Sequence, residues 1–441
     1  MAKLCYYRSK LVLTRLRWWG QQGSNLWPLR CERSALPLSY APICKTSRPI
    51  MLGIQGVNIC HLNLPSETAS GHCHCSTINL WEAMPAPHLS AQVTINLAAL
   101  KANWLALKAE AGAAEVGAAI KAEAYGLGVE RCALALWAAG CRSFFVARPR
   151  EGADLRQILP DAVIYVLDGL YDGEAGYYLQ HHLTPALISI DEARQWGREG
   201  KGAACCIHVD SGINRVSFSF AQAEELKAKN LGLNITLVMS HLASSEERHN
   251  PFNDTQRQRF EKICALFPNV RASLANSSGI FLGPDFALDL VRPGIALYGG
   301  NPQPGLPNPM ATVVTLEARV VQVRDLSVGE AVGYNSTWRA VRDSQIALIG
   351  AGYRDGIPRR MSSTFAQGAQ VFVAGQKCPI VGRVSMDVTA IDVTGTNAKR
   401  GDWAEFFGPN IALDEAAASA GTISWELLTH LGSRYARHYV E

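Results

Sequence analysis

The sequence predicts two folded domains, an N-terminal (β/α)8 barrel over residues 84–312 and a C-terminal all-β domain over residues 313–441. Short apolar runs alternate with helical patterns over about 220 residues, which favours parallel strands joined by helices. After residue 313 the strand patterns follow one another across glycine turns, with few helical patterns between them. The count and length of the first set fit a barrel, and a doubly wound sheet is the alternative.

The barrel elements are read from hydrophobic periodicity. Residues 92–96 alternate as a strand does, and Asn96 supplies a cap for a helix over 97–110. A second apolar run then ends at Lys121. Further strands are expected at 143–147, 162–167, 204–209, 235–239 and 270–273. Helices are expected near 129–140, 149–158, 192–199, 220–230 and 253–266.

The C-terminal domain follows a linker at residues 301–310, which contains four prolines. Few helical patterns interrupt its strands. The strands are expected at 311–323, 344–349, 370–374, 378–381 and 388–393.

Residues 1–83 differ from the rest of the chain. They contain six of the twelve cysteines and four of the ten tryptophans, without a sustained helical or strand period. Residues 20–42 resemble the translation of a transfer-RNA gene. We therefore hypothesise that synthesis begins at Met84 and that 1–83 is a non-native or disordered extension; a basic arm or an organellar presequence is the alternative. The Cys/His pairs between residues 60 and 75 match no common zinc-finger spacing.

The composition of residues 84–441 excludes several partners. Of the chain's 42 basic and 38 acidic residues, nine and three lie in 1–83, which leaves 33 and 35 in the body. This slightly acidic body argues against nucleic-acid binding. No apolar run is long enough to span a bilayer. The cysteines scattered through apolar segments indicate reduced, buried thiols and a cytoplasmic protein.

Residues capable of chemistry follow the predicted barrel strands, where barrel active sites lie. Lys121 comes first, with glycines and Tyr125 directly after it. A lysine partly removed from water has a lowered pKa and can act as a nucleophile or base; the simpler interpretation is a surface lysine. Asn-Ser-Ser-Gly at 276–279 and Arg-Pro-Gly-Ile at 292–295 offer hydroxyls and backbone N–H groups that suit a phosphate.

Five motifs together resemble the alanine racemase family. They are Lys-Ala-x-Ala-Tyr-Gly-x-Gly at 121–128, Ala-Asn-Ser at 275–277, Val-Arg-Pro-Gly-Ile-x-Leu-Tyr-Gly at 291–299, Gly-Tyr-x-Asp-Gly at 352–356 and Gly-Arg-Val-x-Met-Asp at 382–387. The similarity runs from about Val93 to the C-terminus, in the family's order and spacing. It implies a fold-type III racemase that uses pyridoxal 5′-phosphate (PLP), interconverts L- and D-alanine, and supplies D-alanine for cell-wall peptidoglycan.

The resemblance also implies a cofactor site. Lys121 would carry PLP as a Schiff base, and Arg292 would face its pyridine nitrogen. Because arginine is a permanent cation, the ring nitrogen would stay unprotonated and the cofactor would be a weaker electron sink; the simpler interpretation of Arg292 is a structural cation at a strand end. The implied cofactor-binding residues are Lys121, Tyr125, His241, Asn276, Ser277, Arg292, Gly294 and Ile295.

Racemisation needs a proton removed from one face of Cα and returned on the other, most simply by two bases. The resemblance implies that Lys121 is one base and Tyr334 the other. In the family the β domain reaches the barrel mouth of the partner subunit, so the site would require a homodimer. A phenol has a pKa near 10, and His241 and Arg292 are the candidates to stabilise its phenolate.

The amino-acid substrate would be held by its carboxylate. Arg215 and the backbone N–H of Met386 are the implied binding groups, and Tyr353 would lie at the entrance. Core packing is the simpler interpretation of Met386. Alternatives for the whole chain are a broader-specificity or serine racemase, a non-catalytic PLP-binding barrel, and a metal-assisted lyase, for which the C-terminal domain lacks a suitable ligand pair.

The sequence departs from the family pattern at several positions. His208 replaces a lysine that is carbamylated in many members, and Asn214 is a candidate to orient Arg215 instead. Ser273 replaces a histidine, and Ser385 replaces a common cysteine. Trp425 replaces a phosphate-binding tyrosine, and its indole N–H can donate but cannot accept. None of these changes removes an implied proton-transfer residue.

Overall fold

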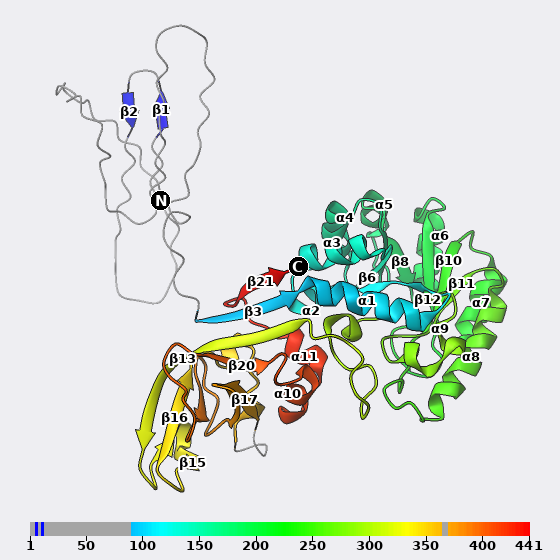
Figure 1. Cartoon of the computed structure of the whole chain (residues 1–441). Coiled ribbons are helices and arrows are strands. Elements are labelled where there is room, and N and C mark those ends of the chain that lie inside the picture. The colour runs from blue at the N-terminus through cyan, green and yellow to red at the C-terminus, as the bar shows by residue number, and fades with distance from the viewer. Residues whose placement is uncertain (1–4, 8–9, 13–89, 364–368) are drawn as a thin grey trace. The chain divides into compact units, whose positions relative to one another are not determined.

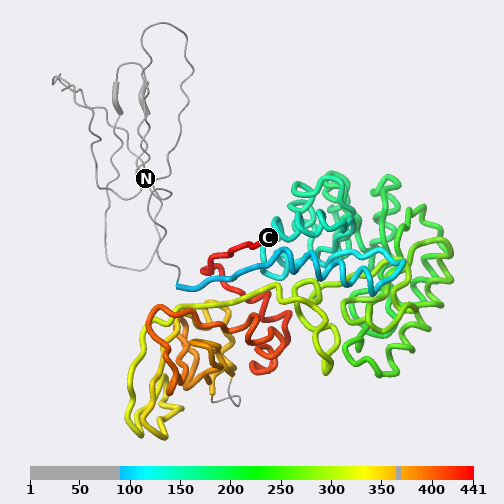
Figure 2. The backbone as a smooth tube through the Cα atoms, viewed as in Figure 1, coloured from blue at the N-terminus to red at the C-terminus, as the bar shows by residue number. Residues whose placement is uncertain are grey.

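The computed structural model describes residues 5–7, 10–12, 90–363 and 369–441 (Figures 1 and 2). The chain divides into two compact units, Met1–His88 and Leu89–Glu441. In the first unit, β1 (Cys5–Tyr7) and β2 (Lys10–Val12) form an antiparallel pair that the sequence did not predict. The hypotheses about residues 13–83 and about a start at Met84 lie outside the described residues.

The predicted barrel is confirmed in the described residues up to 312. Its first strand is interrupted at Gly117, where a Cβ would lie 2.9 Å from the carbonyl oxygen of Ser143. Seven parallel strands are hydrogen-bonded in chain order from β5 to β11, and β12 pairs with β4. The strands are β4 (Glu115–Val116), β5 (Ala118–Ala119), β6 (Ser143–Val146), β7 (Val163–Val166), β8 (Thr184–Leu187), β9 (Ala204–His208), β10 (Asn234–Met239), β11 (Arg271–Ser273) and β12 (Leu290–Val291).

Backbone hydrogen bonds close the ring between β11 and β12. The amide of Asp289 donates to the carbonyl of Ala272 (3.2 Å), and the amide of Arg292 donates to the carbonyl of Ala275 (2.9 Å). Tightly packed side chains fill the interior: Phe145, Tyr165, Ala186, Cys206, Leu237, Met239 and Leu290. The ring is therefore a packed core, and only its rim is free to bind a ligand.

Helices cover the outside of the barrel strands (Figure 1). Asn96 caps the first as expected, its Oδ1 accepting from the amide of Ala99 (2.8 Å). Strand β8 and helices α5 and α9 were not predicted, although the other helices begin within a few residues of the expected positions. The helices are α1 (Leu97–Ala111), α3 (Val129–Ala139), α4 (Pro149–Ile158), α5 (Ala175–Gln180), α6 (Ile190–Glu199), α7 (Phe220–Lys229), α8 (Phe252–Leu266) and α9 (Pro284–Ala287).

The predicted C-terminal sheet is also confirmed. Its strands run in the order β18-β17-β20-β13-β16-β19, and β3 (Ala91–Asn96) joins it by pairing with β13 and β21. The strand expected at 92–96 as part of the barrel therefore belongs to this sheet instead, because its backbone pairs with β13 and β21. The other strands are β13 (Val314–Leu326), β16 (Ser344–Ile349), β17 (Gln370–Val373), β18 (Gln376–Pro379), β19 (Thr389–Asp392), β20 (Trp403–Phe407) and β21 (Ala436–Val440), with a separate hairpin of β14 (Ala331–Val332) and β15 (Trp338–Arg339).

Two unpredicted helices, α10 (Leu413–Ser419) and α11 (Ser424–Thr429), follow β20, and α11 packs against the barrel. It contacts α2 (Lys121–Gly126), where a Cβ at Gly126 would lie 2.5 Å from the carbonyl oxygen of Leu428. Arg437 Nε donates to the carbonyl of Gly126 (3.0 Å). The C-terminal segment therefore supports the residues that follow Lys121. No helix in the described part of the chain is both long and apolar enough to cross a membrane.

Candidate active site

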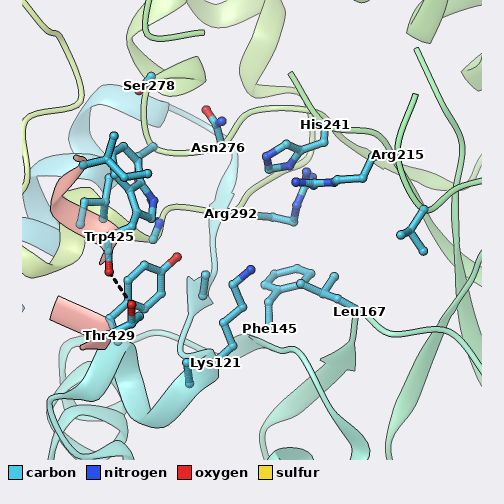
Figure 3. A pocket seen from close by; sticks show the side chains of 18 of the residues that line it. Lys121, Phe145, Leu167, Arg215, His241, Asn276, Ser278, Arg292, Trp425 and Thr429 are labelled. Carbon is cyan, nitrogen blue, oxygen red and sulfur yellow. Dashed lines mark hydrogen bonds between the residues drawn. The ribbon is translucent and has the colours of Figure 1, made fainter. Parts of the chain in front are cut away.

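A cavity of about 630 Å³ lies at the C-terminal ends of the barrel strands (Figure 3). The structure brings together there every predicted site residue of the barrel: Lys121, Tyr125, Arg215, His241, Asn276, Ser277, Arg292, Gly294 and Ile295. In Figure 3 the Lys121 amine points into the cavity, while Arg292, Arg215 and His241 reach in from the opposite wall. Residues that sequence reasoning did not select also line it: Phe145, Leu167, Asp168, Ile423, Glu426 and Thr429.

Lys121 is presented by an unusual backbone conformation. The four residues Ala122–Tyr125 all have left-handed angles, with φ between 53° and 57°. Each such residue costs roughly 1–2 kcal/mol relative to the right-handed helix when it has a Cβ, so surrounding contacts must hold this turn in place. Burial lowers the pKa of Lys121, Arg215 lowers it further, and Glu151 opposes the shift. This direction agrees with a lysine that can act as a base.

One end of the cavity is lined by hydrogen-bond donors. The Ser277 hydroxyl, 4% exposed as a residue, accepts from the amides of Gly294 (2.9 Å) and Ala296 (3.2 Å). A Cβ at Gly294 would lie 2.3 Å from the Tyr125 hydroxyl, so only glycine allows this approach. Burial raises the pKa of Tyr125 to about 12, which keeps the phenol protonated and able to donate. Because the Ser277 oxygen already accepts from two amides, the Ser277 and Tyr125 hydroxyls can serve as donors, and such donors suit a phosphate.

Arg292 occupies the opposite wall and is 8% exposed. Its guanidinium donates to the Ser273 hydroxyl (2.5 Å) and to the carbonyl of Ser240 (2.5 Å). Burial lowers the pKa of Arg292 to about 10, so the side chain remains cationic at neutral pH. Ser273, which stands where many family members have a histidine, therefore holds this arginine by a hydroxyl.

The two histidines of the cavity are uncharged. Burial lowers the pKa of His208 to about 3, and burial together with Arg292 and Arg215 holds the pKa of His241 well below its usual range. The Nε2 atom of His208 has no hydrogen-bond partner among the described residues. Asp168, which lines the cavity, is ion-paired with Arg148. The remaining excess of positive charge suits an anionic ligand.

Asn214, the residue that the sequence suggested as a partner to orient Arg215, does not bind it. The side-chain amide of Asn214 donates to the carbonyl of Gly212 (3.4 Å), and no hydrogen bond joins Asn214 to Arg215 in the described part of the chain.

Trp425, on α11, does line the cavity, as expected for a residue in a phosphate-binding position.

Three predicted site residues of the C-terminal sheet lie away from the cavity. Tyr334 is 69% exposed, Met386 is 51% exposed and Tyr353 is 44% exposed, and none of them lines it. Met386 lies in a tight turn in which the hydroxyl and amide of Ser385 bond to Val388. One chain by itself therefore brings together only the barrel half of the predicted site.

Comparisons with known proteins match both domains. The family model for the alanine racemase N-terminal domain matches residues 95–302, and that for the C-terminal domain matches residues 313–439. Alanine racemase of Methylobacterium sp. (strain 4-46) is 44% identical over 364 residues, covering 80% of this chain and 99% of the relative. That of Acidiphilium cryptum is 47% identical over 352 residues, covering 78% and 97%.

Solved structures of alanine racemases also match this chain. Alanine racemase from Bartonella henselae, determined with covalently bound pyridoxal phosphate, is 38% identical with a TM-score of 0.76, covering 80% of this chain and 99% of that one. The biosynthetic enzyme of Pseudomonas aeruginosa is 30% identical with a TM-score of 0.76, covering 80% and 100%. The barrel, the sheet and these matches define an enzyme of the isomerase class. The chain belongs to the alanine racemase family, which confirms the resemblance drawn from its five motifs.

Proposed function

We propose that this chain interconverts L-alanine and D-alanine with PLP as its cofactor. The observation that carries the proposal is the convergence, in one cavity, of a lysine with a lowered pKa, a group of phosphate-binding donors and a buried cationic arginine. The named relatives, all alanine racemases, support it.

The residues of the cavity fit PLP. Its phosphate would lie against the donor end, near Tyr125, Ser277 and the backbone of Gly294 and Ile295, where a larger side chain at Gly294 would clash with the tyrosine hydroxyl. Lys121 would hold its aldehyde carbon covalently. When bound, PLP supplies an electron sink that makes the Cα–H bond of an attached amino acid acidic.

Arg292 and Arg215 would direct the chemistry from the opposite wall. Arg292 stays charged and tethered to Ser273 and Ser240, so it cannot pass a proton to the ring nitrogen that it would face. This limits side reactions that need a stronger electron sink. Arg215 would bind the substrate carboxylate, with the backbone N–H of Met386 as a second donor.

Proton transfer would use two bases. Lys121 would take or return the Cα proton on one face, and its lowered pKa favours the neutral amine that this requires. Tyr334 would act on the other face. Because Tyr334 and Met386 are exposed and lie away from the cavity of their own chain, we propose that a second copy supplies them in a homodimer.

We also propose a biological setting. D-alanine would be supplied for cell-wall peptidoglycan. The enzyme would work in the cytoplasm, because the six cysteines between residues 90 and 441 are all free thiols. We also propose that the catalytic body comprises the barrel at 84–312 and the sheet domain at 313–441. A chain that begins at Met84 should then be fully active, and a native peptide mapping inside 1–83 would contradict the start at Met84.

The proposal is tested by incubating the purified protein and PLP with L-alanine in D₂O. Racemisation predicts D-alanine that carries deuterium at Cα, together with deuterium in the remaining L-alanine. L-serine assayed in parallel decides substrate breadth. If Cα does not exchange and the alanine stays in the L form, the proposed function is wrong.

A further inference from the structure

Glu151 lies outside the cavity, yet its carboxylate binds two separate segments. Its Oε1 accepts from the amide of Ala122 (2.8 Å), the residue directly after Lys121. Its Oε2 accepts from the amides of Ala147 (2.7 Å) and Arg148 (3.2 Å) at the start of α4. We propose that Glu151 is a positioning residue that aims Lys121 into the cavity by fastening the left-handed turn Ala122–Tyr125 to the N-terminus of α4.

The turn needs such a fastening because its sequence does not favour its conformation. Ala122–Tyr125 contains no glycine, and alanine and glutamate prefer the right-handed helix. The Ala122 amide is the first donor of the turn, so its bond to Glu151 fixes the point at which the chain leaves Lys121. At the far end, the hydroxyl of Tyr125 lies against Gly294. Rotation of the turn would therefore displace both the lysine and the phosphate-binding phenol.

A helix cap alone does not explain these contacts. Glu192 offers a matched comparison, because it lies at the same place in α6 and its Oε2 accepts from the amide of Ile188 (3.0 Å), four residues earlier, as Glu151 does from Ala147. Glu192 does not line the cavity and has no hydrogen bond to the residues around Lys121. Glu192 also accepts a backbone hydrogen bond from a separate segment, at Leu170. What distinguishes Glu151 is that its second contact is made to Ala122, the residue directly after Lys121.

Glu151 also acts on the charge of Lys121. Its carboxylate raises the pKa of Lys121, against the lowering by burial and by Arg215. Replacing the carboxylate by an amide should therefore let the pKa of Lys121 fall further. The other titratable groups that line the cavity around this amine are Tyr125, Asp168, His208, Arg215, His241, Arg292 and Glu426.

The test uses the PLP-loaded enzyme and three variants, Glu151→Ala, Glu151→Gln and the control Glu192→Gln. Hydrogen–deuterium exchange of the peptide that contains residues 121–126 should become faster in Glu151→Ala and stay unchanged in the control. The kcat for alanine should fall on the order of tenfold to a hundredfold in Glu151→Ala, the size expected when a catalytic group is misplaced. Glu151→Gln, which retains an acceptor oxygen, should recover part of this loss.

Glu151→Gln should also move the acid limb of the kcat profile for D-alanine, whose proton Lys121 would take, to lower pH, because a base with a lower pKa becomes neutral at lower pH. Unchanged exchange in Glu151→Ala, or equal effects of Glu151→Gln and Glu192→Gln on the acid limb, would overturn the proposal. The inference rests on the proposed role of Lys121. A wild-type enzyme that exchanges no Cα proton would refute the function, whereas the exchange of residues 121–126 tests the fastening separately.

Discussion

The barrel rim and the turns of the C-terminal sheet contribute to the proposed site in opposite ways. At the rim, Arg292 and Ser277 are buried and bound by several hydrogen bonds before any ligand arrives. On the sheet, Tyr334 and Met386 are exposed, although the turn of Met386 is well hydrogen-bonded. The rim is therefore prepared to hold an anionic cofactor within one chain. The sheet residues, by contrast, are exposed to solvent in a single chain.

The largest loss of racemase activity is expected from a substitution at the barrel rim. Lys121→Ala removes both the covalent attachment of the cofactor and one base, so racemisation should fall on the order of 10³-fold or more. Chiral analysis of alanine measures the rate, and borohydride reduction followed by peptide mapping locates the cofactor. Lys101→Ala, which alters a lysine paired with Glu441, is the control. Cofactor fixed on a lysine other than Lys121 in the wild type would contradict the assignment.

Tyr334→Phe should produce the next largest effect, and only on the reaction that needs the second face. Loss of the phenol should slow removal of the proton from L-alanine by about 10²–10⁴-fold, while the cofactor absorbance stays intact because the rim is unchanged. Tyr171→Phe, at an exposed tyrosine of the barrel that does not line the cavity, is the control. Racemisation by Tyr334→Phe at the wild-type rate would rule out the two-base scheme.

Arg434→Gln should have a smaller effect that appears in substrate binding. Arg434 binds both carboxylate oxygens of the buried Asp355 (2.7 and 2.9 Å) and one oxygen of Asp387 (2.8 Å), so it ties together the turns of Tyr353 and Met386. Its loss should raise KM for alanine on the order of tenfold, with a smaller change in kcat.

Steady-state kinetics measures this split between KM and kcat. Arg342→Gln, which breaks a pair with Asp392 elsewhere in the sheet, should leave KM unchanged. A fall in kcat without a rise in KM would show that Arg434 does not act on substrate binding through the turns of Tyr353 and Met386.

The smallest effect is expected at Trp425, where the C-terminal segment meets the rim. Trp425→Tyr should restore a hydroxyl beside the donor end of the cavity and tighten cofactor binding by about 1 kcal/mol, the net contribution of one hydrogen bond. Titration of the apoprotein with PLP measures the dissociation constant, and Trp425→Phe is the control that lacks a donor. Equal affinities in Trp425→Tyr and Trp425→Phe would show that the residue makes no polar contact with the cofactor.

The same comparison explains what the sequence could predict. The rim residues follow apolar runs whose ends are visible in the sequence, and parallel strands bring those ends together. Strand β8 was missed because Thr184–Leu187 is short and contains a proline. The pairing of β3 with β13 is a contact between residues far apart in the chain, which no local pattern encodes.

Two features of the site could not be predicted from the sequence. The left-handed turn after Lys121 has no glycine before Gly126 to mark it, and Glu151 has the pattern of an ordinary helix cap. Ile423 and Thr429 reach the cavity only because α11, an unpredicted helix, packs against α2. Tertiary packing decides all of these positions.

The proposal that the site is divided between two chains is tested most directly by mixing two inactive variants. Lys121→Ala retains the sheet residues, and Tyr334→Phe retains the rim. After unfolding and refolding together in equal amounts with PLP, mixed dimers would contain one intact site of two, so about a quarter of the wild-type racemase activity should return for a symmetric dimer. Activity that stays at the level of the separate variants, although mixed dimers form, would contradict a site shared between two copies of the chain.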